Sequence, residues 1–155
     1  MMSTTSDRDL RKLVERFVHV SRLMSAAEKR VDIPTYNRLI VRNFAAGDEI
    51  ERAGEAGRRA LESLLDHEIA QVRLAAGQRV LKWDPAKAAP VLLRLMTYES
   101  LQGIHGYERI SVSHSANMML HLHFDVPVYD GTELIEPMRA YGIELSPEQV
   151  QAWRA

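Results

Sequence analysis

Four of the six histidines gather in one stretch of the chain, at His105, His114, His121 and His123. Carboxylates lie close by in the sequence, at Glu99, Glu108 and Asp125. Imidazole and carboxylate groups are the common protein ligands of zinc, and both can serve as a general acid or base. On a helix, His114 and His121 share a face, while His121 and His123 diverge by about 200°. The stretch therefore carries one functional hypothesis, a metal-binding protein or enzyme built on His105–His123.

No established catalytic pattern accompanies these histidines. The His-Glu-x-x-His spacing of zinc enzymes is absent, and Ser111, Ser113 and Ser115 do not form a Gly-x-Ser-x-Gly turn. The segment Gly103–Gly106 lacks the preceding strand and the following Lys-Ser/Thr of a phosphate-binding loop. We therefore expect no enzyme, no metal and no cofactor.

The charges suggest two kinds of partner. Arg58, Arg59, Arg73 and Arg79 could form a basic ridge that binds nucleic acid weakly and in a salt-dependent manner. However, the net charge is −1, and residues 97–155 hold 3 Lys and Arg against 8 Asp and Glu. An acidic segment repels phosphates and attracts a basic protein. A basic protein is thus the expected partner, and nucleic acid is the weaker alternative.

The bulk composition is that of one globular domain. The 155 residues are 46% hydrophobic and 26% charged, and cysteine is absent, which excludes disulfides and thiol chemistry. No apolar run is long enough for a bilayer, and the first residues lack the apolar segment of a signal peptide. We expect a cytoplasmic protein that makes no membrane contact.

Hydrophobic periodicity predicts helices along the whole chain. The first spans about 7–29, and a second begins near Pro34 and bends or stops near Gly47. The next, about 48–65, contains Gly54 and Gly57, which indicate either close helix packing or a break. Further helices are expected at the ranges 72–80, 85–95, 111–123, 132–141 and from 147 onward.

Three details of these helices are specific predictions. Asp84-Pro85 is a strong helix start, with the Asp side chain as cap. For 112–123 the alternation of Met119, His121 and His123 leaves a strand possible, but we favour a helix capped by Ser113. Ser146, followed by Pro147, predicts the last helix start.

The middle of the chain resembles a HEAT-type helical repeat. The residues that carry the resemblance are Leu61, Leu64, Asp66, Val72, Arg73, Ala75, Ala76, Leu81, Ala88 and Leu92. With Tyr36-Asn-Arg-Leu39, Arg58-Arg-Ala-Leu61 and Asp84-Pro85, residues 8–123 resemble a small bacterial family of HEAT-like domains of unknown function. The resemblance implies a compact all-α bundle of about seven helices, with residues 125–155 as a helical extension. It implies no catalytic residues.

Together these observations predict a single non-catalytic domain that binds another protein. The sharper hypothesis is an immunity protein that blocks a cognate toxin with a basic surface, because such a chain is small, acidic at one end and free of a catalytic set. The expected binding residues are Glu99, His105, Tyr107, Glu108, His121, His123, Asp125, Tyr129, Asp130, Glu133 and Glu136.

Overall fold

The computed structural model describes residues 6–97, 101 and 103–152, and over these residues it contains helices and no strands. The all-α prediction is therefore confirmed, and residues 112–123 are helical. The elements in chain order are α1 (Asp7–Lys29), α2 (Ile33–Arg52), α3 (Glu55–Glu62), α4 (Ala70–Val80), α5 (Pro85–Leu95), α6 (Gly106–Phe124), the short 3₁₀ helix η2 (Thr132–Leu134), α7 (Ile135–Arg139) and α8 (Pro147–Ala152).

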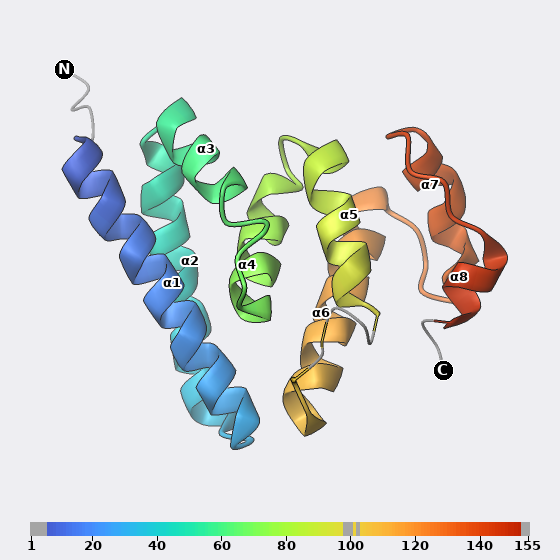
Figure 1. The fold of residues 1–155 in the computed structure, drawn as a ribbon, viewed down its shortest axis with the longest axis horizontal. Coiled ribbons are helices and arrows are strands. Elements are labelled where there is room, and N and C mark those ends of the chain that lie inside the picture. Colours follow the sequence, from blue (N-terminus) through green and yellow to red (C-terminus); the bar gives the residue numbers. More distant parts are fainter. Residues whose placement is uncertain (1–5, 98–100, 102, 153–155) are drawn as a thin grey trace.

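The helices stand side by side in a row (Figure 1). The long helices α1 and α2 form an antiparallel pair at one end, α4, α5 and α6 occupy the middle, and α7 and α8 close the other end. Within the described residues, no helix has both the length and the apolar character that a bilayer crossing requires.

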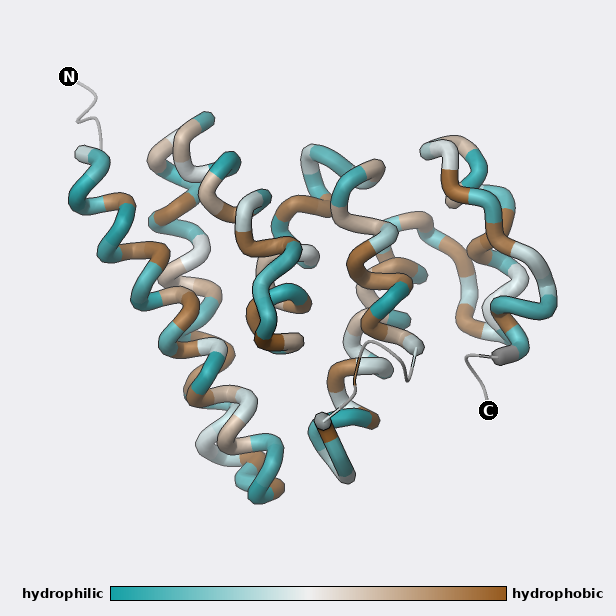
Figure 2. The backbone as a smooth tube through the Cα atoms, in the orientation of Figure 1, coloured by the Kyte–Doolittle hydropathy of each residue, from teal (hydrophilic) through white to brown (hydrophobic). Residues whose placement is uncertain are grey.

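Helix α4 is the centre of the core. Its residues Val72, Ala76 and Val80 are fully buried, and neighbouring polar positions on the same helix are buried as well. A helix that is enclosed on nearly all sides is covered by packed neighbours. Figure 2 shows apolar positions recurring along the helices, and among them Phe17 of α1 and Leu92 of α5 are also fully buried.

Four predicted helix starts, near residues 7, 34, 85 and 147, are confirmed by cap hydrogen bonds. A side-chain oxygen that accepts from a first-turn amide satisfies a donor that the helix itself cannot. The capping oxygens belong to Ser6, Asp32, Asp84 and Ser146, which accept from the amides of Asp9, Thr35, Lys87 and Gln149 at 3.2, 3.2, 3.3 and 3.2 Å.

The predicted bend or stop at Gly47 is wrong. Helix α2 continues through Gly47 to Arg52, and the break falls at Gly54, one of the two alternatives open for that region. Gly47 is instead a packing position, because a Cβ there would lie 2.1 Å from Nε of Arg79. The buried Arg79 side chain pairs with Asp48 and Glu51 of α2, at 3.0 and 2.5 Å.

Two predictions for the C-terminal half also need correction. Helix α6 begins at Gly106, so Ser113 lies inside the helix, where its hydroxyl donates to the carbonyl oxygen of Met96 at 3.3 Å instead of capping. The expected helix at 132–141 is a 3₁₀ turn followed by the single turn of α7.

Candidate functional site

One face of α6 opens onto a cavity of about 300 Å³. His114, Asn117 and His121 contribute from successive turns of the helix, as the prediction that His114 and His121 share a face requires. The loop after α6 supplies the opposite wall through Tyr129 and Asp130. The cavity therefore forms where the C-terminal segment, residues 125–152, folds back onto α6.

The side chain of His121 connects α6 to the C-terminal segment through a contact with Glu133. The ring is 2% exposed, and its two nitrogens lie 2.8 Å from the carbonyl oxygen of Asn117 and 3.0 Å from a carboxylate oxygen of Glu133. A carbonyl and a carboxylate accept hydrogen bonds, so a ring nitrogen that carries a proton can donate to the acceptor beside it. Because both nitrogens face internal acceptors, neither is directed at a metal ion.

Glu133 organises the loop that forms the cavity wall. Its carboxylate accepts from the backbone amides of Tyr129 at 2.7 Å, Gly131 at 3.1 Å and Asp130 at 3.4 Å. Burial opposes the charge of this group, but the amides of Tyr129 and Gly131 and the His121 ring outweigh it and lower the pKa of Glu133 to about 2. The loop is thus built around an ionised carboxylate.

Gly131 fits this loop for two reasons. Its φ of 90° lies in the left-handed region that glycine adopts without strain. A Cβ at this position would also lie 2.5 Å from a methyl carbon of Val150, a buried residue of α8. Residue 131 therefore brings the loop into close contact with the last described helix.

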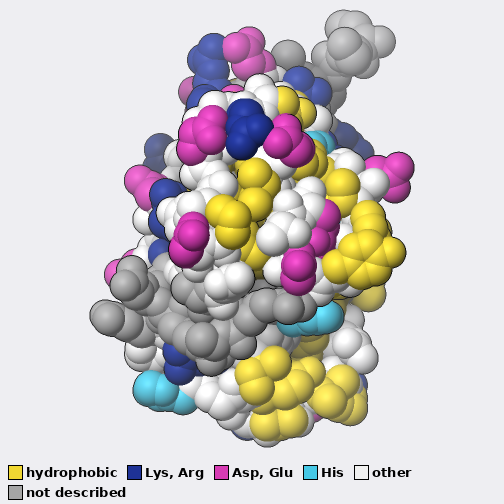
Figure 3. Space-filling view, turned by 90° about the vertical axis from the view of Figure 1, so that its right-hand side faces the viewer, with side chains coloured by type: hydrophobic (Ala, Val, Ile, Leu, Met, Phe, Trp, Pro, Cys, Tyr) yellow, Lys and Arg dark blue, Asp and Glu magenta, His cyan; other side chains and the backbone are white. Residues whose placement is uncertain are grey.

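Three apolar side chains are exposed around the cavity, which Asp130 and Arg109 also line. Ile110, Val128 and Tyr129 line the cavity with 69%, 47% and 74% of their surfaces exposed. Residues 125–152 hold six Asp and Glu against a single basic residue, Arg139. Figure 3, viewed toward α7 and α8, shows acidic side chains between hydrophobic ones over this end. We call this end of the molecule the acidic face.

The predicted site residues do not all lie together in the structure. His121, Tyr129, Asp130 and Glu133 come together at the cavity. Glu136 is exposed and pairs with Arg139 at 2.6 Å. Glu108 is 1% exposed and lines a different cavity near the start of α6, so it does not belong to the acidic face.

The remaining predicted residues lie at the two ends of α6. His105 and Tyr107 are exposed at its start. His123 and Asp125 are exposed at its other end, where the His123 ring packs edge-on against Phe124 with centroids 4.9 Å apart. Glu99 lies outside the described residues. Sequence reasoning missed Asn117 and Ile110 as cavity residues, although helical spacing from His114 and His121 could have identified Asn117.

The structure also bears on the two alternative hypotheses, a metal site and a basic ridge that binds nucleic acid. Within the described ranges, no three His, Asp or Glu side chains converge to hold a metal ion. In the expected basic ridge, Arg79 is only 5% exposed and is tied to α2, Arg59 pairs with Glu55 at 2.5 Å, and Arg58 lies over the Trp83 ring. The ridge therefore lacks Arg79 as a phosphate ligand.

Comparison with known proteins gives one match. Residues 11–123 match the model of a family described as Domain of unknown function (DUF2019). Searches of curated proteins and of solved structures found no match. The matched region ends within α6, so Tyr129, Asp130 and the rest of the opposite cavity wall lie beyond it.

Proposed function

Because the chain belongs to the family described as Domain of unknown function (DUF2019), a description that assigns no activity, we propose its function from its surface. We propose that the chain is a non-catalytic domain that binds a basic partner protein through the acidic face. The observation that carries the proposal is the group of exposed apolar side chains, Ile110, Val128 and Tyr129, that borders the cavity at the acidic end of the molecule.

This combination supports protein recognition for physical reasons. Exposed aromatic and aliphatic side chains supply binding energy once a partner removes them from water, and tyrosine is enriched among the residues that dominate interfaces. The carboxylates of residues 125–152 would accelerate encounter with a partner of opposite charge and disfavour acidic partners. The cavity would receive one side chain of the partner between α6 and the Tyr129–Asp130 loop.

The more specific proposal is an immunity protein that neutralises a cognate bacterial toxin in the cytoplasm. A toxin that acts on nucleic acid needs a basic active site, and an acidic face could cover such a site. The small size of the chain and the absence of a catalytic motif in the sequence support this function. A HEAT-like arrangement of the helices, suggested by the sequence resemblance, would supply a rigid scaffold for the face.

The test uses the product of the neighbouring gene as the partner. Co-expression should protect cells from that product, and the two purified proteins should form a complex whose association slows with added salt. Tyr129→Ala should weaken the complex by at least about tenfold, since a buried interface tyrosine contributes on the order of 2 kcal/mol. Asp130→Lys should slow association.

The matched control is Val41→Ala, which removes a side chain of similar exposure, 69%, from α2 at the opposite end of the molecule. This variant should bind as the wild type does. The proposal fails if the neighbouring product is harmless and does not bind, or if Tyr129→Ala and Asp130→Lys bind it with unchanged affinity.

A further inference from the structure

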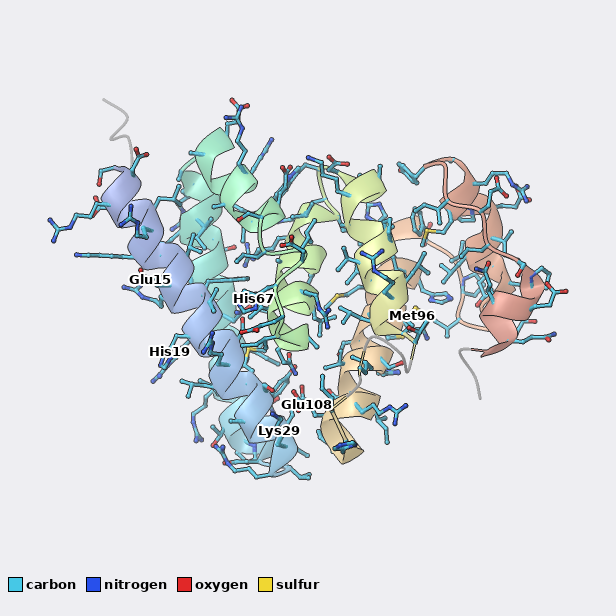
Figure 4. The ribbon with its side chains drawn as sticks, in the orientation of Figure 1. Glu15, His19, Lys29, His67, Met96 and Glu108 are labelled. Atoms are coloured by element: carbon cyan, nitrogen blue, oxygen red, sulfur yellow. The ribbon has the colours of Figure 1, made fainter. Side chains whose placement is uncertain are left out.

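A second cavity, of about 390 Å³, lies between α1, the start of α4 and the start of α6. Its size falls in the range of small-molecule binding sites. The first cavity lies toward the other end of α6, and the two share no lining residue. Figure 4 labels Glu108 of α6 and Lys29 of α1, and both line this cavity.

Glu108 supplies a buried carboxylate to this cavity. It is 1% exposed, and the hydroxyl of Ser25 donates to one of its carboxylate oxygens, Oε1. The other oxygen, Oε2, is buried and has no hydrogen-bond partner among the described residues. An unsatisfied buried oxygen on a carboxylate is costly, so a ligand that donates a hydrogen bond here would be stabilised.

A second buried carboxylate strengthens the preference for a cationic donor. Glu28 is also 1% exposed and accepts a hydrogen bond from the side-chain amide of Gln71. Burial raises the pKa of Glu28, and the negative charge of Glu108 raises it further. A positive group placed at Glu108 would relieve the repulsion between the two carboxylates.

Apart from Glu108, the charged residues that line the cavity are three cations and the exposed carboxylate of Glu68, so positive charge predominates there. Arg22 and Lys29 of α1 are exposed at its edge, and Arg73 of α4 is half-buried beside them. Helix α4 begins at this cavity without a side-chain cap, so its N-terminal partial positive charge also faces the space. These groups favour an acidic group on the same ligand.

The two sets of charges exclude simpler ligands. A plain anion would meet the buried carboxylate of Glu108, and a plain amine or metal cation would meet Arg22, Lys29 and Arg73. A molecule that carries both charges satisfies both sets. Because Glu108 is buried while Arg22 and Lys29 are exposed, the ammonium group would point inward and the acidic group outward.

We propose that this cavity binds a free α-amino acid, with its ammonium group at Glu108 and its carboxylate at Arg22, Lys29 and Arg73. The apolar side chains of Ile69 and Ile104, which also line the cavity, would contact the side chain of the ligand. The proposal does not depend on the acidic face or on its partner.

The first experiment measures binding by isothermal titration calorimetry with each of the common L-α-amino acids. At least one should bind with one site per chain. Its N-acetyl derivative, which lacks the ammonium group, and the corresponding amine, which lacks the carboxylate, should each bind at least about tenfold more weakly. If no amino acid binds, or if both derivatives bind as tightly as the parent, the proposal is overturned.

The second experiment uses variants of the full chain. Glu108→Gln preserves the shape of the side chain but removes its charge, and Arg22→Gln removes a cation at the edge of the cavity. Each should weaken binding of the amino acid by about tenfold, whereas Arg11→Gln, an exposed control outside the cavity on the same helix, should not.

Circular dichroism would establish that each variant is folded. Wild-type affinity in a folded Glu108→Gln variant would overturn the assignment of the ammonium group. If Glu108→Gln does not fold, Arg22→Gln decides the question, because its exposed side chain is not part of the core.

Discussion

The guanidinium group of Arg79 occupies the space that a side chain at position 47 would need. A Cβ built on Gly47 would lie 2.1 Å from Nε and 2.3 Å from the central carbon of that group. Arg79 donates from one terminal nitrogen to Asp48 and Glu51 and from the other to the carbonyl oxygen of Phe44. Arg79 thereby joins α4 to α2, and Gly47 leaves the space that its guanidinium group occupies.

Gly47→Ala should therefore destabilise the protein, although alanine is the better helix former. Displacing Arg79 from its buried contacts should cost about 2–4 kcal/mol in the free energy of unfolding, measured by urea denaturation. In an Arg79→Met background the same Gly47→Ala change should be neutral or stabilising by about 1 kcal/mol, the helix-propensity difference alone. An equal loss of stability in both backgrounds would contradict this explanation.

Glu133→Gln should loosen the loop that forms the cavity wall. The carboxylate accepts from three backbone amides and the His121 ring, and an amide side chain has one accepting oxygen. We expect a loss of about 1–3 kcal/mol in unfolding free energy and faster hydrogen exchange at the amides of Tyr129 and Gly131. Glu136→Gln, in an exposed pair with Arg139, should cost less than about 1 kcal/mol.

The low pKa of Glu133 also predicts an acid-sensitive contribution to stability. Folding lowers the pKa of this carboxyl from 4.5 to about 2, so its stabilising effect is complete above about pH 4.5 and is lost as the pH falls toward 2. Unfolding free energies across that interval should therefore fall more steeply for the wild type than for Glu133→Gln. Parallel curves for the two proteins would show that the carboxylate is not the source of the effect.

The contribution of Glu28 to stability should depend on pH in the opposite sense to that of Glu133. Burial raises its pKa, so the folded state holds this proton more tightly than the unfolded state does. The contribution of Glu28 to stability must then decrease as the pH rises above its unfolded value of 4.5. The unfolding free energy of Glu28→Gln relative to the wild type should increase between about pH 4 and about pH 7. A difference that does not change with pH would contradict the prediction.

The sequence predicted those features of the fold whose causes are local. The starts at Asp84 and Ser146 depend on a cap and its first turn, so nearby residues were sufficient to identify them. The role of Gly47 was missed because its cause, Arg79, lies on another helix. A glycine in a helical pattern indicates a break and a packing contact equally well until the neighbour is known.

The candidate site was predicted in composition but not in arrangement. His121 and Glu133 were both selected as binding residues, yet no spacing rule indicates that a loop returns to place them 3.0 Å apart. Glu108 was selected with them, but it faces a different cavity because it lies near the start of the same long helix. Proximity in sequence along α6 was therefore a poor guide to which residues act together.

The attachment of residues 125–152 has a consequence for how such chains could diversify. Three apolar side chains that are buried almost completely, Leu134, Met138 and Val150, hold this segment to the domain. Packing constrains those positions, whereas the side chains of Tyr129 and Asp130 are exposed. Other side chains could therefore replace these two while the backbone of the loop stays bound to Glu133, so that the surface could be adapted to a new partner without redesign of the interior.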